Sequence, residues 1–309
     1  MMHVKFWGVR GSIPTPGANT VGVGGNTACI ELQYGDDNRI IIDAGTGIRE
    51  LGDTLLRDRA VRGDGDPLHL FLFLTHTHWD HIMGFPFFAP IYTSGTSIDL
   101  YGPVTWEDES LRKVIGHQLS YQYFPVHSGE LAANLQFHEL REETVDLPDG
   151  MTVRTKYLNH PVRCLSYRFE YRGRSVVTAY DTEPFRNVFP SDPADPDYDA
   201  EIAVEATRAA EAENERLRAF FRETDLLIHD AQYTREEYLK ARIGWGHSSL
   251  EDAVETAIAS RARRLVLFHH DPERSDEELN RLVVEYRRSG REHGLDIDLA
   301  KEGLTVTIE

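Results

Sequence analysis

The chain has 309 residues, a hydrophobic content of 40% and a formal net charge of −18. This length and composition predict one or two globular domains with a sizeable core, and they exclude a disordered chain. The acidic excess argues against a broad surface for long nucleic acids, because such binding depends on Lys and Arg that neutralise phosphates. It does not exclude a small anionic substrate at a locally positive metal site.

Neither the cysteines nor the N-terminus indicates a secreted or membrane protein. Cys29 and Cys164 lie in runs of alternating apolar residues and are expected to be buried free thiols, which are too few for a cysteine-rich zinc module. The first residues lack the pattern of a signal peptide, and no apolar run is long enough to cross a bilayer. We therefore expect a cytoplasmic protein with no membrane partner.

Hydrophobic periodicity and turn residues predict strands that are separated by helices along the whole chain. A loop rich in Gly and Pro is expected at 11–17, and a hairpin turn at 35–38. The expected strands are 4–7, 28–34, 39–42, 68–74, 98–101, 151–158, 165–171, 175–179, 225–228, 265–268, 295–299 and 304–308, and the expected helices are 48–62, 107–117, 200–222, 249–260 and 276–293.

This order of elements predicts an α/β fold of the αββα type, in which two mixed β-sheets pack face to face and are flanked by helices. We expect a single domain over residues 1–309. An acidic, proline-rich loop at 190–197 precedes a long charged helix, and together they predict an acidic helical insertion near 190–222.

A dense group of histidines and aspartate follows the expected strand at 68–74. Thr75-His76-Thr77-His78-Trp79-Asp80-His81 has the pattern H-x-H-x-D-H. Imidazole and carboxylate groups at this spacing can hold two metal ions side by side, and burying them without a partner would be costly. The alternative is a solvated polar loop.

Further candidate ligands follow other expected strands at the point where each strand ends. Strand ends that gather at one edge of a sandwich can converge, which a binuclear metal site requires. Each of these residues alone could instead be a surface or capping residue. They are His160, Asp181, His229, Asp230, His269 and His270.

With these motifs the chain resembles the metallo-β-lactamase superfamily over nearly its whole length. The matching pieces are Asp43-Ala44-Gly45-Thr46-Gly47, the H-x-H-x-D-H loop, His160, Asp181 and His269. Within that superfamily the chain resembles the branch of ribonuclease Z and cyclic-phosphate phosphodiesterases. Three stretches carry this finer resemblance: 6–12 with 24–27, then 227–233, and Gly246-His247-Ser248-Ser249.

The resemblance implies two divalent metal ions whose ligands form two sets. His269 is preferred over His270 because of its place after the strand at 265–268, although both remain open. Asp43 is expected to orient a ligand histidine. The ligands suit zinc first, with manganese or iron as alternatives. The first set is His76, His78 and His160, the second is Asp80, His81 and His269, and Asp181 bridges the two ions.

The resemblance also implies a reaction, in which a hydroxide that bridges the two ions attacks a phosphodiester. His247 is expected to donate a proton to the leaving group, Asp230 to orient His247, and Asp80 to belong to the catalytic centre. The alternative for His247 is a neighbour of a helix cap, because Ser248 and Ser249 precede a helical run.

A small phosphodiester, either a cyclic nucleotide or a cyclic ribose phosphate, is the expected substrate. The acidic charge and the lack of a visible glycine-rich, basic arm count against transfer RNA, and a homodimer is expected from the resemblance alone. The branch usually has Gly where this chain has Tyr180, which implies a reshaped pocket floor. It usually has Glu where this chain has Asp230, which shortens any contact that this side chain makes. The aromatic residues that could form a substrate wall, or could instead be core, are Phe85, Phe87, Phe88, Tyr121 and Tyr123, and core packing is preferred for the segment 121–125.

Other functions remain as alternatives. A ribonuclease Z-like RNA endonuclease would show a steep dependence on salt. Hydrolysis of a thioester or lactam is disfavoured by the Gly-His-Ser and His-Asp-Ala segments, which serve phosphodiester members. A non-catalytic metal-binding regulatory module would keep the fold without the reaction. A redox di-iron role is disfavoured because two cysteines cannot hold an iron–sulfur cluster.

Overall fold

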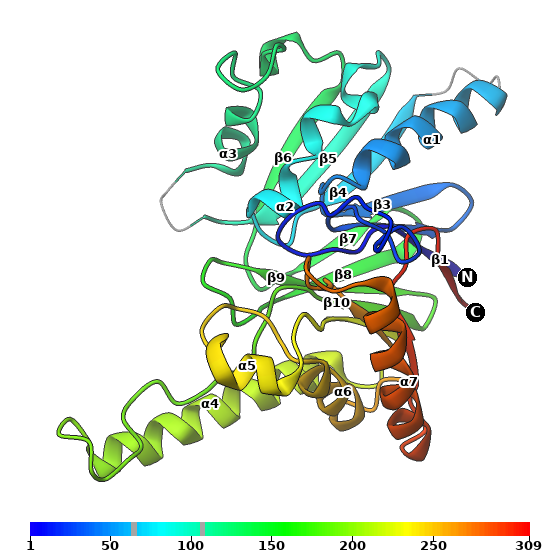
Figure 1. The fold of residues 1–309 in the computed structure, drawn as a ribbon. Helices are drawn as coiled ribbons and strands as arrows, with labels where there is room; N and C mark the ends of the chain where they lie inside the picture. The colour runs from blue at the N-terminus through cyan, green and yellow to red at the C-terminus, as the bar shows by residue number, and fades with distance from the viewer. Residues whose placement is uncertain (63–66, 106–108) are drawn as a thin grey trace.

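Two seven-stranded sheets form the centre of the molecule (Figure 1). The computed structural model describes residues 1–62, 67–105 and 109–309. In spatial order, the first sheet contains β14 (Thr305–Ile308), β1 (Met2–Gly8), β2 (Cys29–Tyr34), β3 (Asn38–Ile42), β4 (Leu68–Phe73), β5 (Thr96–Pro103) and β6 (Asn134–Leu140). The second contains β13 (Asp296–Leu299), β12 (Arg264–Phe268), β11 (Leu226–Asp230), β10 (Arg174–Ala179), β9 (Leu165–Tyr171), β8 (Met151–Tyr157) and β7 (Thr144–Leu147).

Both sheets are mixed. In the first sheet the pairs from β14 to β3 are antiparallel and those from β3 to β6 are parallel. In the second sheet the pairs from β13 to β10 are parallel and those from β10 to β7 are antiparallel. The helices lie outside the two sheets in Figure 1, with α1 (Ile48–Arg62), α2 (Trp79–Ile82) and α3 (Leu111–His117) beside the first and α4 (Ala200–Phe221), α5 (Arg235–Ala241), α6 (Leu250–Ala259) and α7 (Asp276–Glu292) beside the second.

Strand β4 shows how the sequence builds two cores. Its apolar residues alternate between the faces of the sheet, as side chains on a strand must. Phe71 and Phe73 join the core between the sheets, whereas Leu70 and Leu72 join the core between the first sheet and its helices. Burying each such side chain contributes roughly 1.5–3 kcal/mol, so a continuous apolar run is what a strand buried on both faces needs.

The αββα architecture predicted from the sequence is confirmed, and Cys29 and Cys164 are buried free thiols. The helix predicted at 107–117 begins at Leu111, where the hydroxyl of Ser110 caps it by accepting from the backbone N–H of Lys113. Residues 107 and 108 lie outside the described residues. Strands β6 and β7 and helix α5 were not predicted.

The structure decides between the alternatives for the aromatic residues at 85–88 and contradicts the preference for the segment 121–125. Phe85 and Phe88 are fully buried against α1 and therefore cannot form a substrate wall, whereas Phe87 is exposed. Tyr121 and Tyr123, for which core packing was preferred, are exposed. The preference for 121–125 was wrong because aromatic residues favour burial but composition does not tell which side of a short turn faces solvent. No helix in the described ranges is long and apolar enough to cross a membrane.

Candidate metal centre

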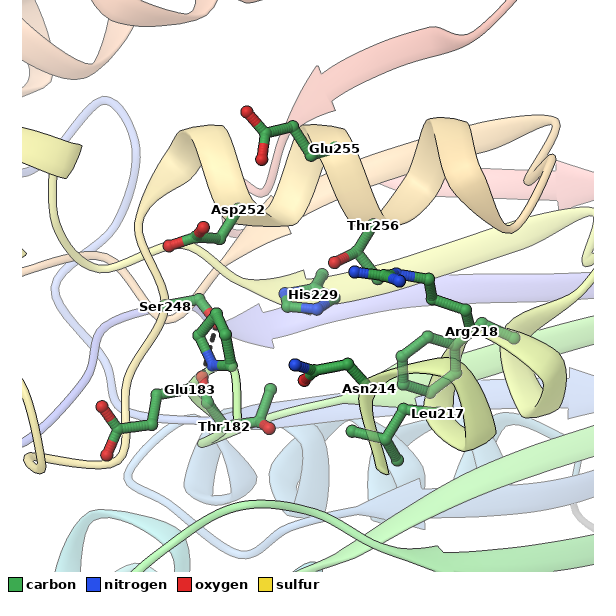
Figure 2. Close-up of a pocket in the computed structure, with 12 residues that line it drawn as sticks. Thr182, Glu183, Asn214, Leu217, Arg218, His229, Ser248, Asp252, Glu255 and Thr256 are labelled. Atoms are coloured by element: carbon green, nitrogen blue, oxygen red, sulfur yellow. Dashed lines mark hydrogen bonds between the residues drawn. The ribbon is translucent and has the colours of Figure 1, made fainter. Parts of the chain in front are cut away.

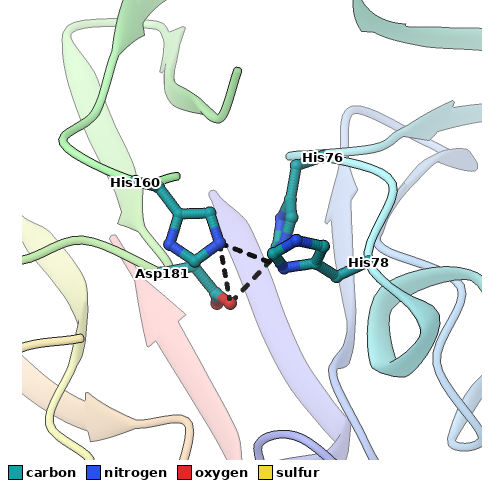
Figure 3. Close-up of side chains that lie close together, drawn as sticks. All are labelled: His76, His78, His160 and Asp181. Carbon is teal, nitrogen blue, oxygen red and sulfur yellow. Dashed lines mark hydrogen bonds and ion pairs between the residues drawn. The ribbon is translucent and has the colours of Figure 1, made fainter. Parts of the chain in front are cut away.

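The first group of predicted ligands meets at the carboxyl ends of three strands (Figure 3). His76 and His78 follow β4, His160 follows β8, and Asp181 follows β10. One nitrogen or oxygen atom from each lies within 4.8 Å of the others. Nδ1 of His78 is 3.1 Å from Nε2 of His160, and Nε2 of His76 is 3.4 Å from Oδ2 of Asp181.

The second group shares Asp181 with the first. Asp80, His81, Asp181 and His269 each offer an atom within 4.8 Å of the others, and all four are buried. Oδ1 of Asp181 is 3.2 Å from Nε2 of His81 and 3.2 Å from Nε2 of His269. One carboxylate thus faces both groups, with a different oxygen toward each.

The side chains of both groups are better suited to binding divalent metal ions than to forming hydrogen bonds with one another. Nε2 of His76 and Oδ1 of Asp181 are buried and make no hydrogen bond. The facing nitrogens of His78 and His160 can share one proton at most, whereas a metal ion accepts a lone pair from each. Burial lowers the pKa of His81, but the carboxylates of Asp181, Asp80 and Asp43 outweigh this and raise it well above its usual value. A cation is therefore favoured among these carboxylates.

Two of the predicted ligand histidines are oriented by acceptors on their other ring nitrogen. Nδ1 of His81 donates to Oδ2 of Asp43 at 2.7 Å, and Nδ1 of His160 donates to the carbonyl oxygen of Gly246 at 3.0 Å. Asp43 is itself held by the backbone N–H of Thr75 at 2.7 Å. Such acceptors fix the ring and leave Nε2 free for a metal, as was expected of Asp43.

Glycines let the backbone approach the histidine rings closely. A Cβ on Gly11 would lie 2.5 Å from the ring of His269, and a Cβ on Gly246, where φ is +82°, would lie 2.3 Å from Nδ1 of His160. Beside Gly11, the backbone N–H of Ser12 donates to Oδ2 of Asp80 at 2.8 Å. The glycines of the glycine-rich opening and of the Gly-His-Ser segment are therefore needed at this centre, because a larger residue would clash with a histidine ring.

Beside the two groups lies a pair formed by Asp230 and His247. Nδ1 of His247 donates to Oδ2 of Asp230 at 3.0 Å, and the ring of His247 stacks on that of His269 with centroids 5.0 Å apart. Burial lowers the pKa of His247, but the neighbouring Asp230 outweighs it and raises the pKa to about 9. The pair leaves Nε2 of His247 available beside the metal groups.

Two of the candidate histidines lie outside these groups. Because neighbours on a strand point to opposite faces, His229 points away from Asp230 into a separate pocket between α4 and α6 (Figure 2). His270 is buried and its Nε2 donates to the carbonyl oxygen of Ala300 at 2.9 Å. The open choice between His269 and His270 thus has a geometric answer, since His269 alone of the two joins a group.

Sequence reasoning missed Glu183, which follows Asp181 by two residues. Its buried carboxylate accepts from the backbone N–H groups of Gly244 at 2.9 Å and Gly246 at 3.2 Å. It also accepts from the hydroxyl of Tyr238 at 2.8 Å. Glu183 therefore fixes the loop whose Gly246 carbonyl holds His160. The only signal in the sequence was an acidic residue next to a predicted ligand.

Replacing Glu183 with glutamine should weaken metal binding without removing any predicted ligand. The amide cannot accept two backbone N–H bonds and a hydroxyl as the carboxylate does, so His160 would lose its fixed acceptor. We expect metal affinity to fall roughly 10–100-fold, the usual effect of removing an outer hydrogen-bond partner. Titration against a chromogenic chelator measures it. Glu255→Gln, on the exposed side of α6, is the control, and unchanged affinity in Glu183→Gln would contradict this role.

The family model described as "Beta-lactamase superfamily domain" matches residues 38–196, more than half of the chain. The chain belongs to the beta-lactamase superfamily. This superfamily member is similar to ribonuclease Z from Lactococcus lactis subsp. cremoris (strain SK11), with 25% identity over 307 aligned residues that cover 87% of this chain and 88% of the relative. The resemblance expected from the motifs is confirmed.

Solved structures of the superfamily share the fold. The metallo-beta-lactamase fold protein YhfI from Bacillus subtilis aligns with a TM-score of 0.65 at 18% identity, covering 99% of this chain and 100% of that one. A diphosphatase from the PhnP family aligns with a TM-score of 0.60 at 18% identity, covering 100% of this chain and 98% of that one. By its family model and its sequence relatives, the chain is a metal-dependent hydrolase of the beta-lactamase superfamily.

Proposed function

We propose that this hydrolase is a binuclear metal-dependent phosphodiesterase that acts on a small phosphodiester, either a cyclic nucleotide or a cyclic ribose phosphate. The observation that carries the proposal is that two ligand groups share Asp181 and lie beside the Asp230–His247 pair. One ion would be held by His76, His78 and His160, the other by Asp80, His81 and His269, with Asp181 bridging; zinc is the first candidate.

Two ions held there would act as Lewis acids on a phosphoryl oxygen. The chain's own contribution is the proton for the leaving group. His247 is held by Asp230 through Nδ1, so its Nε2 is directed to the substrate and donates to the leaving oxygen. Asp43 and the Gly246 carbonyl keep the rings of His81 and His160 in place during the reaction.

A small substrate is supported by charge. The net charge is −18, and the loop that leads into α4 is acidic at Asp192, Asp195, Asp197 and Asp199. In Figure 1 this loop and the start of α4 extend away from the sheets. A long RNA would meet repulsion there, because its affinity depends on basic side chains. A compact phosphodiester needs the metal centre alone.

A hydrolysis screen tests the proposal. Purified protein, loaded separately with zinc and with manganese, would be given 3′,5′- and 2′,3′-cyclic nucleotides, an aryl phosphodiester and a precursor transfer RNA. We expect turnover of a cyclic nucleotide well above that of the aryl ester. Absence of hydrolysis of every phosphodiester by protein that contains two ions would overturn the proposal.

The second candidate function is a ribonuclease, because the sequence relative described above is named ribonuclease Z. It would be favoured if the precursor RNA were cleaved while the cyclic nucleotides were not. Its rate should then fall steeply as salt rises, since each phosphate contact releases counterions. A small substrate should show a shallow dependence on salt.

The adjacent histidines at the end of β12 offer a matched test of the ligand assignment. His269→Gln is expected to bind one metal ion fewer per chain, whereas His270→Gln should keep both ions and lose about 1 kcal/mol of stability with its buried hydrogen bond. Metal analysis of the folded variants measures both. Full occupancy in His269→Gln would remove His269 from the ligand set.

A further inference from the structure

A second pocket opens on the His247 side of the metal centre. It has a volume of about 280 Å³, and Tyr233, Arg242 and Asp271 are among the residues that line it. The ring of Tyr233 meets the ring of His247 nearly edge to face, with centroids 6.1 Å apart. The pocket therefore begins one aromatic ring away from the group formed by Asp230, His247 and His269.

Two of the residues that line the pocket, Tyr233 and Arg242, carry flat groups, and Trp245 lies beside Arg242. The guanidinium carbon of Arg242 lies 4.3 Å from the ring centroid of Trp245 and 5.7 Å from that of Tyr233. Trp245 is 54% exposed, which is unusual for an indole that could have packed inside. Among the described residues, Arg242 has no carboxylate partner. The guanidinium of Arg242 and the ring of Tyr233 are surfaces on which a planar, aromatic group stacks.

The rest of the pocket lining is mostly acidic, and two of its carboxylates form no ion pair among the described residues. Arg274 is paired with Glu237 at 2.6 Å and with Glu278 at 3.0 Å, so its one positive charge is shared by two carboxylates. Within the described part of the chain, Asp271 and Glu273 form no ion pair. Among the described residues that line the pocket, Arg242 is the one cation left to balance them, so the lining keeps a net negative charge. The pocket therefore disfavours a second phosphate and offers oxygen acceptors to a neutral group that carries N–H donors.

We infer that this pocket binds the base of a nucleotide substrate, with a preference for bases that bear an exocyclic amino group. The base stacks against Arg242 and the rings beside it, and the amino group donates to Asp271. The volume is slightly below the ~300–1,000 Å³ of sites for drug-sized ligands, as suits a base rather than a whole ligand. The inference rests on the proposed function, since the ester itself would lie at the metal centre.

Phosphate-free nucleosides provide a test that does not depend on turnover. Binding of adenosine, cytidine, guanosine and uridine would be followed by quenching of tryptophan fluorescence in the metal-loaded protein, with Trp245→Phe showing which part of the signal comes from Trp245. We expect saturable binding, with uridine roughly tenfold weaker than adenosine because stacking is shared but the amino contact is not. Absence of saturable binding, or equal binding of all four, would overturn the inference.

Two variants locate the binding. Asp271→Asn replaces an acceptor by an amide and should reduce the difference between adenosine and uridine, and Arg242→Met should weaken all four nucleosides. Asp53→Asn, exposed on α1, is the control, and thermal melting checks that each variant is folded. If both pocket variants bind nucleosides as the unaltered protein does, the pocket is not the site.

Turnover separates this inference from the proposed function. Saturable nucleoside binding that both variants alter, in a protein that hydrolyses no phosphodiester, would support the pocket and overturn the proposed phosphodiesterase. Hydrolysis of every cyclic nucleotide at one rate, without nucleoside binding, would support the phosphodiesterase and overturn the pocket. Hydrolysis of adenosine and cytidine cyclic phosphates in preference to the uridine ester would support both.

Discussion

Asp181→Asn should leave the protein folded but unable to hold two metal ions. Asparagine has the same shape as aspartate, yet it carries no charge and offers one oxygen where Asp181 directs its two oxygens toward different histidine groups. We expect the metal content to fall to one ion or fewer per chain. Turnover should drop by roughly 10²–10³ or more, the loss that follows removal of a main electrostatic group from an active centre.

Elemental analysis of the dialysed variant and hydrolysis of its best phosphodiester measure these effects. Asp197→Asn, in the exposed acidic loop before α4, is the control for loss of one negative charge and should behave as the unaltered protein. Two ions per chain in folded Asp181→Asn would show that Asp181 does not bridge. Turnover close to that of Asp197→Asn would show that Asp181 does not contribute to catalysis.

Much of this candidate centre could be predicted because the proposed ligands follow strands. An apolar run long enough for a buried strand is visible in the sequence, and so is the polar residue at its end. His76, Asp181 and His269 each come one to three residues after a strand of the parallel parts of the sheets. Parallel strands end at a common edge, so the convergence of these side chains follows from the topology.

The choice between neighbouring residues depended on backbone geometry that the sequence does not show. Asp43, Asp181 and His269 have φ angles of 60°, 40° and 59°, in the left-handed region that such residues rarely adopt. A turn of this kind directs His269 into the site and His270 away from it. Each such left-handed φ angle costs of order 1–3 kcal/mol of folding free energy. It persists only because the surrounding structure holds the residue in that conformation. Periodicity within a strand cannot predict such a turn.

One missed element had a signal and one did not. Helix α5 begins at a capping box in which Thr234 and Glu237 bond each other's backbone N–H, and this Thr-x-x-Glu pattern is visible in the sequence. The role of Glu183 had no such pattern, because it depends on a loop about sixty residues away that folds back onto it. Long-range hydrogen bonds of this kind come from the fold, not from local sequence.

His247→Ala should lose turnover, as Asp181→Asn does, but unlike that variant it should keep both metal ions. His247 donates to Asp230 and stacks on His269, but it belongs to neither of the two groups that share Asp181. Removing a positioned proton donor typically costs 10²–10⁴-fold in rate, so we expect a loss of roughly that size. The measurements are metal content and turnover of the same folded sample.

The leaving group provides the sharper version of this test. An aryl ester leaves as a stable phenolate and needs little protonation, whereas a ribose alkoxide needs a proton. His247→Ala should therefore lose more activity on a cyclic nucleotide than on the aryl ester, and Asp230→Asn should show the same pattern with a smaller loss, since it leaves the imidazole in place. An equal loss on both esters would argue that His247 binds the substrate rather than donating a proton. Loss of an ion from His247→Ala would instead make it a metal ligand, as its place in the third group with Asp230 and His269 allows.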